Sequence, residues 1–414
     1  MIGFKLPARN LRRHGRRSLY AGTIIAVTLA ALGLFDGFSN YMYSTVEELL
    51  IYSSTEGHVL ISRPAFARSD FSDIEQTLIP AATAADLMAE LAEDPRVVLT
   101  APQLRVAGLM SNGNVSVPFR ANGVRYADQR RIFELARGPV RLMVQRELDR
   151  PLPPVYGAAL GRGLAQILGL EVGDTAMALT ATIDGHINAL DVEVSSVFTV
   201  PQAELSSLLA TLSLEHAQAL YDTQAVDRIA VVLQRGIDAQ AFAGELQARL
   251  DAAGTDLKAQ DWRTRDPLYE SVKRLFDTIF SFMFVIVVVI VGLSVTITVG
   301  MSITERTREL GAMRALGLTQ FGLVRLIAVE CVALATISSA IGGILFVLGG
   351  MLVERLNVYW LPPLFLTPLP IRIDGNATHV AIIGLALIGL TGVAGAVAAL
   401  RAARRSIVDA LGYH

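Results

Sequence analysis

The residue types that catalyse hydrolysis or hold metals occur in this chain, but not at spacings that support either chemistry. Asp184 with His186, and Glu215 with His216, could act as acid–base pairs, yet solvent-exposed polar residues explain both pairs more simply. The sequence contains no Gly-x-Ser-x-Gly elbow and no His-Glu-x-x-His helix. The six histidines are scattered, at His14, His58, His186, His216, His379 and His414. We therefore predict no catalytic and no metal-binding residues, and a chain that is not itself an enzyme.

A nucleotide-binding loop is also missing from the sequence. Loops that cradle ATP phosphates read Gly-x-x-x-x-Gly-Lys-Ser/Thr, and the lysine is essential to that arrangement. This chain has three lysines, Lys5, Lys258 and Lys273, and none of them follows a glycine. We expect no cofactor-binding residues and no cofactor bound by this chain.

Composition excludes several further classes of protein. Of 414 residues, 52% are hydrophobic and 18% charged, with a mean hydropathy of +0.46. Such a chain is too apolar to remain disordered. Its one cysteine, Cys331, cannot form a disulfide within the chain. A formal net charge of −2 gives no general attraction to phosphate, so we expect no nucleic-acid partner.

The apolar residues gather in four runs, about 19–38, 278–303, 323–353 and 377–400. Each is long enough to cross about 30 Å of hydrocarbon as a helix. The first is predicted to be an uncleaved anchor, because no small-x-small cleavage pattern follows it. The predicted fold class is an α-helical integral membrane protein with four transmembrane helices and a large α+β extracytoplasmic domain inserted between the first and second.

The distribution of arginine and lysine predicts the orientation of the chain. Basic residues crowd the N-terminal flank, the loop between the second and third runs, and the C-terminal flank, which places these segments in the cytoplasm. Residues 40–277 hold 21 Lys+Arg and 31 Asp+Glu, a net charge of −10, as an external domain allows. The predicted segments are an amphipathic entry helix at 1–18, membrane helices at 19–38, 278–303, 323–353 and 377–400, a periplasmic domain at 39–274, a cytoplasmic coupling loop at 304–320, a periplasmic loop at 354–376 and a cytoplasmic tail at 401–414.

Apolar residues at helical spacing continue beyond two of the spans. They follow the first span at Met42, Val46, Leu49 and Leu50, and precede the second at Leu268, Val272, Leu275, Phe276 and Ile279. We expect these extensions to pair as a stalk, although two unrelated surface helices would give the same pattern.

The region between the first two spans shows alternating strand and helix signals. Strands are predicted at 57–62, 113–119, 175–181, 191–200 and 228–233, and helices at 83–92, with Thr83 as N-cap, 161–168 and 239–252. Asp184-Gly185 predicts a hairpin turn, and the Pro- and Arg-rich stretch 138–154 predicts a division into two lobes.

Some residues within the membrane helices are polar or small. Asp36 and Glu330 are candidates for a proton relay, but each lies near the end of its span, where a carboxylate can reach interfacial water. Gly33 with Gly37, Ser338 with Gly342 and Ser339 with Gly343 are one turn apart, which favours close helix packing.

Residues 304–319, TERTRELGAMRALGLT, form the most informative segment. Alternating charges follow a charge-free span, and Leu310, Met313, Arg314 and Leu316 lie at helical spacing before Gly317. A helical knob that docks into a soluble partner fits this pattern. A plain basic connector would explain the arginines but not the apolar face.

This segment resembles the signature of the FtsX-like ABC permeases, the type VII family that includes macrolide exporters and lipoprotein-releasing complexes. Residues 8–19 are similar to the family's entry helix, 160–174 to a recurrent Leu-Ala…Leu-Gly…Gly-Asp stretch, and 401–411 to its closing segment. Asp261-Trp262 before the second span also fits.

The resemblance implies a permease subunit in the bacterial inner membrane, with both termini cytoplasmic. It implies a pair of ABC ATPase subunits, which bind ATP and Mg. It also implies a second permease, a copy or a paralogue, that forms a dimer with this chain. A periplasmic adaptor or carrier is a further partner that the resemblance allows. The residues assigned to ATPase coupling are Glu305, Arg306, Arg308, Glu309, Leu310, Met313, Arg314, Leu316 and Gly317. Among them Glu309 and Arg314 are expected to form ion pairs with the ATPase, and Leu310 and Met313 to be apolar anchors.

The implied function is mechanotransmission, in which ATP hydrolysis in the partner drives periplasmic motion that extracts or exports a lipoprotein, lipid or other amphiphile, including by efflux. The alternative is a signalling scaffold that activates an external cell-wall hydrolase and transports nothing.

Overall fold

The computed structural model describes residues 15–68, 74–200, 203–305, 312–313, 317, 319–361 and 368–403. The chain divides into two compact units. We call residues 1–43, 271–358 and 370–414 the helical unit, and residues 44–270 with 359–369 the inserted domain.

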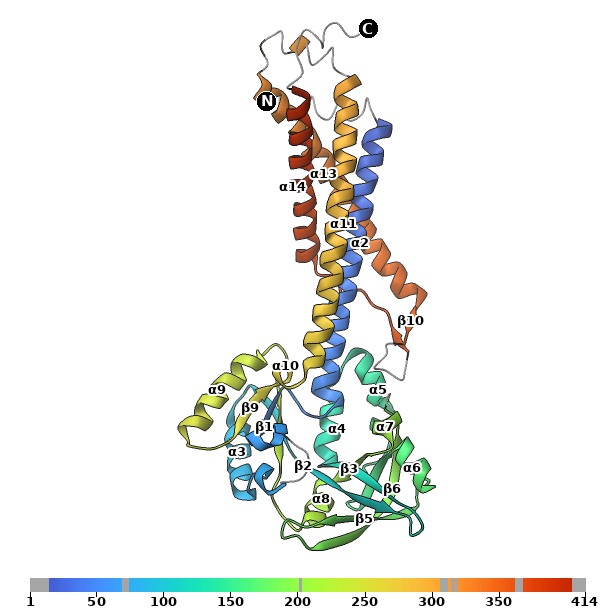
Figure 1. Ribbon diagram of the computed structural model, residues 1–414, viewed down its shortest axis with the longest axis vertical. Helices are drawn as coiled ribbons and strands as arrows, with labels where there is room; N and C mark the ends of the chain where they lie inside the picture. Colours follow the sequence, from blue (N-terminus) through green and yellow to red (C-terminus); the bar gives the residue numbers. More distant parts are fainter. Residues whose placement is uncertain are drawn as a thin grey trace. The chain divides into compact units, whose positions relative to one another are not determined.

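Four long helices dominate the helical unit (Figure 1). They are α2 (Gly15–Glu48), α11 (Pro267–Glu305), α13 (Gln320–Leu356) and α14 (Ala377–Ala403). Within the described residues, these four are long and apolar enough to cross a membrane, as the sequence predicts. A helix satisfies all its backbone polar groups internally, which a span through hydrocarbon requires. Both α2 and α11 extend well beyond their apolar runs, which confirms the predicted helical extensions.

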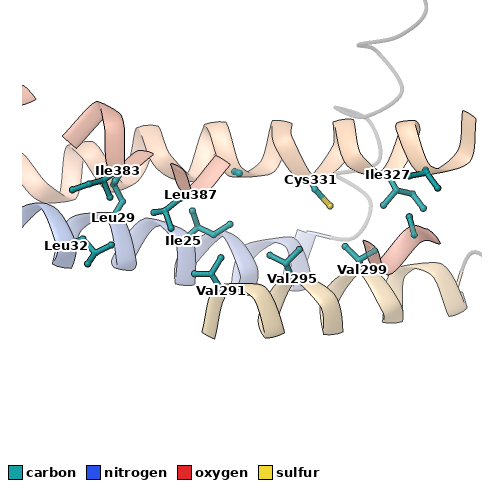
Figure 2. Close-up of a cluster of buried hydrophobic side chains, with 14 of the residues drawn as sticks. Ile25, Leu29, Leu32, Val291, Val295, Val299, Ile327, Cys331, Ile383 and Leu387 are labelled. Carbon is teal, nitrogen blue, oxygen red and sulfur yellow. The ribbon is translucent and has the colours of Figure 1, made fainter. Parts of the chain in front are cut away.

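The four helices share one apolar core (Figure 2). Side chains four residues apart lie on one face of α11 and pack against apolar side chains of the other three helices. The labelled members are Ile25, Leu29 and Leu32 of α2, Val291, Val295 and Val299 of α11, Ile327 and Cys331 of α13, and Ile383 and Leu387 of α14. Cys331 is therefore a buried packing residue.

Small residues bring α2 and α13 into close contact. A Cβ on Gly342 would lie 2.7 Å from the carbonyl oxygen of Ala26, and one on Gly22 would lie 2.8 Å from Oγ of Ser338. The predicted role of Ser338 and Gly342 in helix packing is confirmed. A Cβ on Gly343 would have no neighbour within 4 Å among the described residues, so close packing at that position, within the chain or across a dimer, stays a prediction.

The inserted domain is built on a nine-stranded mixed sheet in the order β3-β7-β4-β6-β5-β2-β8-β1-β9. The strands are β1 (Val59–Ser62), β2 (Val97–Ser111), β3 (Ser116–Val124), β4 (Gly157–Gly161), β5 (Thr175–Ala181), β6 (Ile187–Phe198), β7 (Leu209–Ser213), β8 (Arg228–Leu233) and β9 (Lys258–Asp261). β3 with β7 and β4 with β6 are parallel, and the other neighbours are antiparallel. A two-stranded pair, β10 (Tyr359–Trp360) and β11 (Leu369–Pro370), lies outside this sheet.

Helices of moderate length accompany the sheet (Figure 1). They are α3 (Ala81–Glu93), α4 (Tyr126–Leu135), α5 (Gly138–Leu148), α6 (Arg162–Leu168), α7 (Ala203–Ser206), α8 (Leu214–Tyr221), α9 (Ala239–Ala252) and α10 (Trp262–Arg265). The π-helix Leu49–Ser53 continues from α2, and Pro64–Arg68 and Ile74–Thr77 are 3₁₀ turns.

Sequence and structure agree on the local elements of this domain more than on its long-range organisation. The bounds of β5, β8 and α9 are as predicted, and the β5–β6 hairpin turns at Gly185 with φ +80°. The division into two lobes at 138–154 is wrong, because β2 pairs with β3, β5 and β8 and holds one sheet together. Thr83 is not the N-cap of α3, which follows Pro80.

A buried polar network fixes the centre of the sheet. Arg228, 1% exposed, donates to Gln103 Oε1 at 2.9 Å and Asn122 Oδ1 at 2.9 Å, and contacts Asp227. Asp227 also accepts from Arg105 at 2.9 Å. Since a buried charge is costly without partners, this network ties β8 to β2 and β3.

His58, which precedes β1, is buried in a neutral form. Its Nδ1 accepts the backbone N–H of Leu233 at 3.1 Å, so its proton resides on Nε2, and its ring meets that of Tyr52 edge-on. Burial, reinforced by the positive charge of Arg235, lowers the pKa of His58 to about 4 from an ordinary value near 6.5.

The lowered pKa of His58 predicts a loss of stability in acid. The unfolded chain protonates this imidazole below pH 6.5 and the folded chain only near pH 4, so the stabilisation is present above pH 6.5 and disappears as pH falls toward 4. The full effect is about 3 kcal/mol. Thermal unfolding of wild type and His58→Gln between pH 7.5 and 4.5 should show a shallower decline for the variant. Parallel declines would contradict the prediction.

Close packing at Gly342 predicts unequal effects of two adjacent substitutions. Gly342→Ala forces its new methyl group against the backbone of α2, and should lower the free energy of unfolding by about 1–3 kcal/mol. The control, Gly343→Ala, adds the same atoms in open space and should be neutral or slightly stabilising. Thermal unfolding in detergent measures both, and equal shifts would refute the assigned contact.

Candidate functional site

The end of α2 that leads into the inserted domain and the beginning of α11 are joined by an aromatic cluster. The ring of Phe276 on α11 lies 6.2 Å from that of Phe35, 5.9 Å from Phe38 and 6.0 Å from Tyr43, all on α2. Phe280, one turn further along α11, lies 6.1 Å from Phe35. Aromatic pairs at these separations contribute about 0.5–1.5 kcal/mol each beyond their buried area. We call these five residues the aromatic clasp.

A hydrogen bond reinforces the clasp. The hydroxyl of Tyr43 donates to Oδ1 of Asp277 at 2.9 Å. The predicted apolar face of α11 is partly wrong, since Leu275 and Ile279 are 58% and 42% exposed. The face toward α2 is instead defined by the i, i+4 pair of phenylalanines in the clasp.

The same turns of α2 also contact the segment that leads into α14. The Tyr41 hydroxyl donates to the carbonyl of Pro370 at 2.6 Å, and the N–H of Asp374 donates to the carbonyl of Gly37 at 3.1 Å. His379 Nδ1 lies 3.2 Å from Oδ2 of Asp36. This end of α2 is therefore held by α11 and by the chain preceding α14.

At its other end α11 enters the predicted coupling segment. The described part of the helix extends to Glu305, which is exposed, and Gly317 adopts φ +101°, a conformation that favours glycine. Thr319 then caps α13, its Oγ1 accepting the N–H of Gly322 at 3.1 Å. Met313 is half-buried and packs against the core of the helical unit.

Other predicted coupling residues lie outside the described part of the chain. They are Arg306, Arg308, Glu309, Leu310, Arg314 and Leu316. The entry helix before residue 15 and the tail after residue 403 lie outside it as well. The assignment of coupling residues thus stays a prediction.

The aromatic clasp and the coupling segment are connected by a single helix. Residues 276 and 280 of the clasp and Glu305 belong to α11, with no break between them. Because an α-helix rises 1.5 Å per residue, the 25 steps from residue 280 to residue 305 extend about 37 Å. Glu305 and the clasp are thus connected by continuous helix, without an intervening loop.

No metal centre accompanies this arrangement in the described residues, since no three His, Cys, Asp or Glu side chains there gather closely enough to hold an ion.

Two family models match the chain. The MacB-like periplasmic core domain matches residues 23–249, more than half of the chain, and the FtsX-like permease C-terminal model matches residues 281–407. The chain belongs to the FtsX-like, MacB-type permease family. It is an ABC transporter permease by family, with the domain between its first two apolar helices corresponding to the family's periplasmic core.

Individual proteins similar to this permease include two from Xylella fastidiosa. Lipoprotein-releasing system transmembrane protein LolC of strains Temecula1 and 9a5c is 25% identical over 336 residues, covering 77% of this chain and 79% of LolC. Among solved structures, the periplasmic region of MacB from Actinobacillus actinomycetemcomitans is 14% identical, with a TM-score of 0.35, over 51% of this chain and 92% of that one. The extracellular domain of the noncanonic ABC-type transporter YknZ from Gram-positive bacteria is 10% identical, with a TM-score of 0.31, over 49% and 98%.

Sequence reasoning missed the aromatic clasp of this permease. The available signal is the spacing of phenylalanines at 276, 280 and 284, opposite Phe35 and Phe38. The pattern was indistinct because aliphatic residues at 275 and 279 fit the same helical period.

The ring contacts of the clasp predict that Phe276 contributes more to the free energy of unfolding than the adjacent Leu275. Phe276→Ala removes three ring contacts and should lower the free energy of unfolding by about 2 kcal/mol, less than the about 3–5 kcal/mol of a fully buried phenylalanine because the side chain is half-buried. Leu275→Ala, at an exposed site on the same helix, is the control and should change stability by less than about 0.5 kcal/mol. Thermal unfolding in lipid nanodiscs provides the comparison, and equal losses would exclude the clasp as a stabilising contact.

Proposed function

We propose that this permease converts ATP hydrolysis by a separate ATPase into motion of its periplasmic domain. The observation that carries the proposal is the unbroken course of α11 from the aromatic clasp to Glu305, at the start of the coupling segment. A rigid helix can transmit an axial displacement over that length, whereas a flexible loop would change its conformation instead.

The ATPase docks, in this proposal, on residues 305–317. Glu309 and Arg314 form ion pairs with it, Leu310 inserts into its surface, and the exposed part of Met313 contacts it beside the helical core. The half-buried position of Met313, packed against the helical core, supports a role in relaying force from partner to bundle. ATP and Mg bind in the partner chain. A second permease, either a copy of this chain or a paralogue, completes the transporter, and a periplasmic adaptor or carrier receives the substrate.

The substrate, in this proposal, is a lipoprotein or another amphiphile taken from the outer leaflet of the inner membrane. The similarity to a lipoprotein-releasing protein over three quarters of the chain supports this class. Mechanical extraction suits such a substrate, because its acyl chains already lie in the membrane and need no aqueous channel.

The proposed orientation places both termini and residues 304–320 in the cytoplasm. Short segments rich in arginine flank these ends of the helices, and such segments remain on the cytoplasmic side.

Two substitutions test the docking of the ATPase. Arg314→Glu reverses a proposed ion pair and Leu310→Asp places a charge in an apolar contact, so each should reduce co-purification of the ATPase, and its stimulation by the permease, by at least ten-fold. Arg146→Glu and Leu142→Asp make the same changes at exposed positions of α5 and should have no effect. Undiminished ATPase stimulation by both coupling variants would refute the proposed docking site.

A further inference from the structure

The inserted domain contains a cavity of about 370 Å³ that is lined mainly by polar and aromatic side chains. Its wall is formed by the last turn of α2, the π-helix that follows, His58 just before β1, the β8–α9 loop and α10. π-helical turns occur frequently at functional sites. This volume is at the lower end of the range for small-molecule sites.

Several charged groups in the wall are already fully engaged. Arg235 forms a bidentate pair with Glu48, donates to the carbonyl of Leu135 at 2.7 Å and stacks on Tyr52. Glu48 accepts, in addition, the N–H of Arg137 at 3.0 Å. The charges of Arg235 and Glu48 neutralise each other, and their hydrogen bonds make this side of the cavity rigid.

Asp238, also in the wall, caps α9. Its Oδ1 accepts the N–H groups of Gln240 and Ala241 at 3.0 and 3.4 Å. Its charge is directed at the helix terminus.

Three other side chains in the wall have hydrogen-bonding atoms that find no partner among the described residues. His58 is 93% buried, with Nδ1 committed to Leu233, so the ring offers an Nε2–H that bonds to no described residue. Glu47 accepts no hydrogen bond from a described residue. The guanidinium of Arg263 lies over Trp262 and Tyr269, 5.0 and 5.8 Å from the ring centres, and donates to no described carboxylate.

Two of these three groups, Glu47 and Arg263, carry opposite charges. Desolvation raises the pKa of Glu47, opposed mainly by the nearby charge of Arg263. A carboxylate with poor solvation and no donor gains from a cationic ligand group. A guanidinium packed against aromatic rings, with no carboxylate partner among the described residues, can still donate N–H groups to a carboxylate or a phosphate.

We propose that this cavity binds a small zwitterion in which an ammonium group is joined to a phosphate or a carboxylate. The ammonium pairs with Glu47, the acidic group with Arg263, and the Nε2–H of His58 donates a further hydrogen bond to the ligand. A ligand with a single charge satisfies one of the two residues and is repelled by the other. The polar lining excludes acyl chains, so a lipid would enter by its head group alone.

The site is tested with full-length protein in nanodiscs of phosphatidylglycerol, which has no ammonium group. The probe is glycerophosphoethanolamine, and its two halves, glycerol 3-phosphate and ethanolamine, are the comparison ligands in calorimetric titrations. We expect the zwitterion to bind at least ten-fold more tightly than either half. Equal binding of either half, or no binding of the zwitterion at millimolar concentration, would overturn the proposal.

Substitutions locate the site. Glu47→Gln and Arg263→Gln should each weaken binding of the probe about ten-fold, while thermal unfolding confirms that the variants are folded. The controls Glu245→Gln and Arg249→Gln make the same chemical changes on α9 outside the cavity and should leave binding unchanged. Binding that is unaffected by both cavity substitutions would also overturn the proposal.

A final arm distinguishes a lipid head group from a free zwitterion. Phosphatidylethanolamine is added to the nanodiscs in increasing proportion. If the natural ligand is the lipid, it competes and the apparent affinity for the probe falls. If the ligand is a free molecule, the affinity is unchanged. Either result upholds the site and identifies its source of ligand.

Discussion

The pairing of α2 with α11 is the contact on which the proposed mechanism depends. α2 leads into the inserted domain and α11 leads out of it, so residues 44–270 are connected to the helical unit through these two helices. Aromatic side chains hold the pair, with Phe276 at the centre, and the hydrogen bond from Tyr43 to Asp277 fixes the register. In a bilayer the hydrophobic effect does not drive helices together, so specific packing of this kind has to do so.

A second constraint comes from small residues. Gly22 and Gly342 allow α2 to approach α13 closely enough for direct backbone contact. α2, the helix that enters the domain, is therefore in contact with α13 near its beginning and with α11 near its end. The predicted coupling segment joins α11 to α13 along the chain, so in the proposed mechanism an ATPase that moves it acts on two of the helices that α2 contacts.

The sequence was sufficient to predict what depends on local pattern. Four apolar runs, their helical extensions, the Asp-Gly hairpin and the limits of β8 and α9 follow from periodicity and turn chemistry. The contacts that are distant in sequence could not be predicted in this way. β2 contains Pro102 and Gly108 and lacks clean alternation, yet it joins the whole sheet through pairing with three other strands.

The candidate site shows the same division. The coupling segment was predicted because its charges and apolar spacing lie within sixteen residues. The clasp was not, because helical period alone leaves two faces of α11 equally apolar, and only packing against α2 selects Phe276 over Leu275. The engagement of His58 with Leu233, 175 residues away, likewise has no local signal.

The central claim is that α2 and α11 must be joined for ATP-driven motion to reach the domain. The most direct test is rescue of the Phe276→Ala variant by a covalent link. Tyr43→Cys and Asp277→Cys are introduced together with Cys331→Ala, which removes the native thiol, and a short bis-maleimide joins the pair. The measurement is ATP-driven release of lipoprotein by the complex of permease and ATPase in proteoliposomes. The account predicts that Phe276→Ala lowers release and that the cross-link restores it. Release that stays low after complete cross-linking would contradict it.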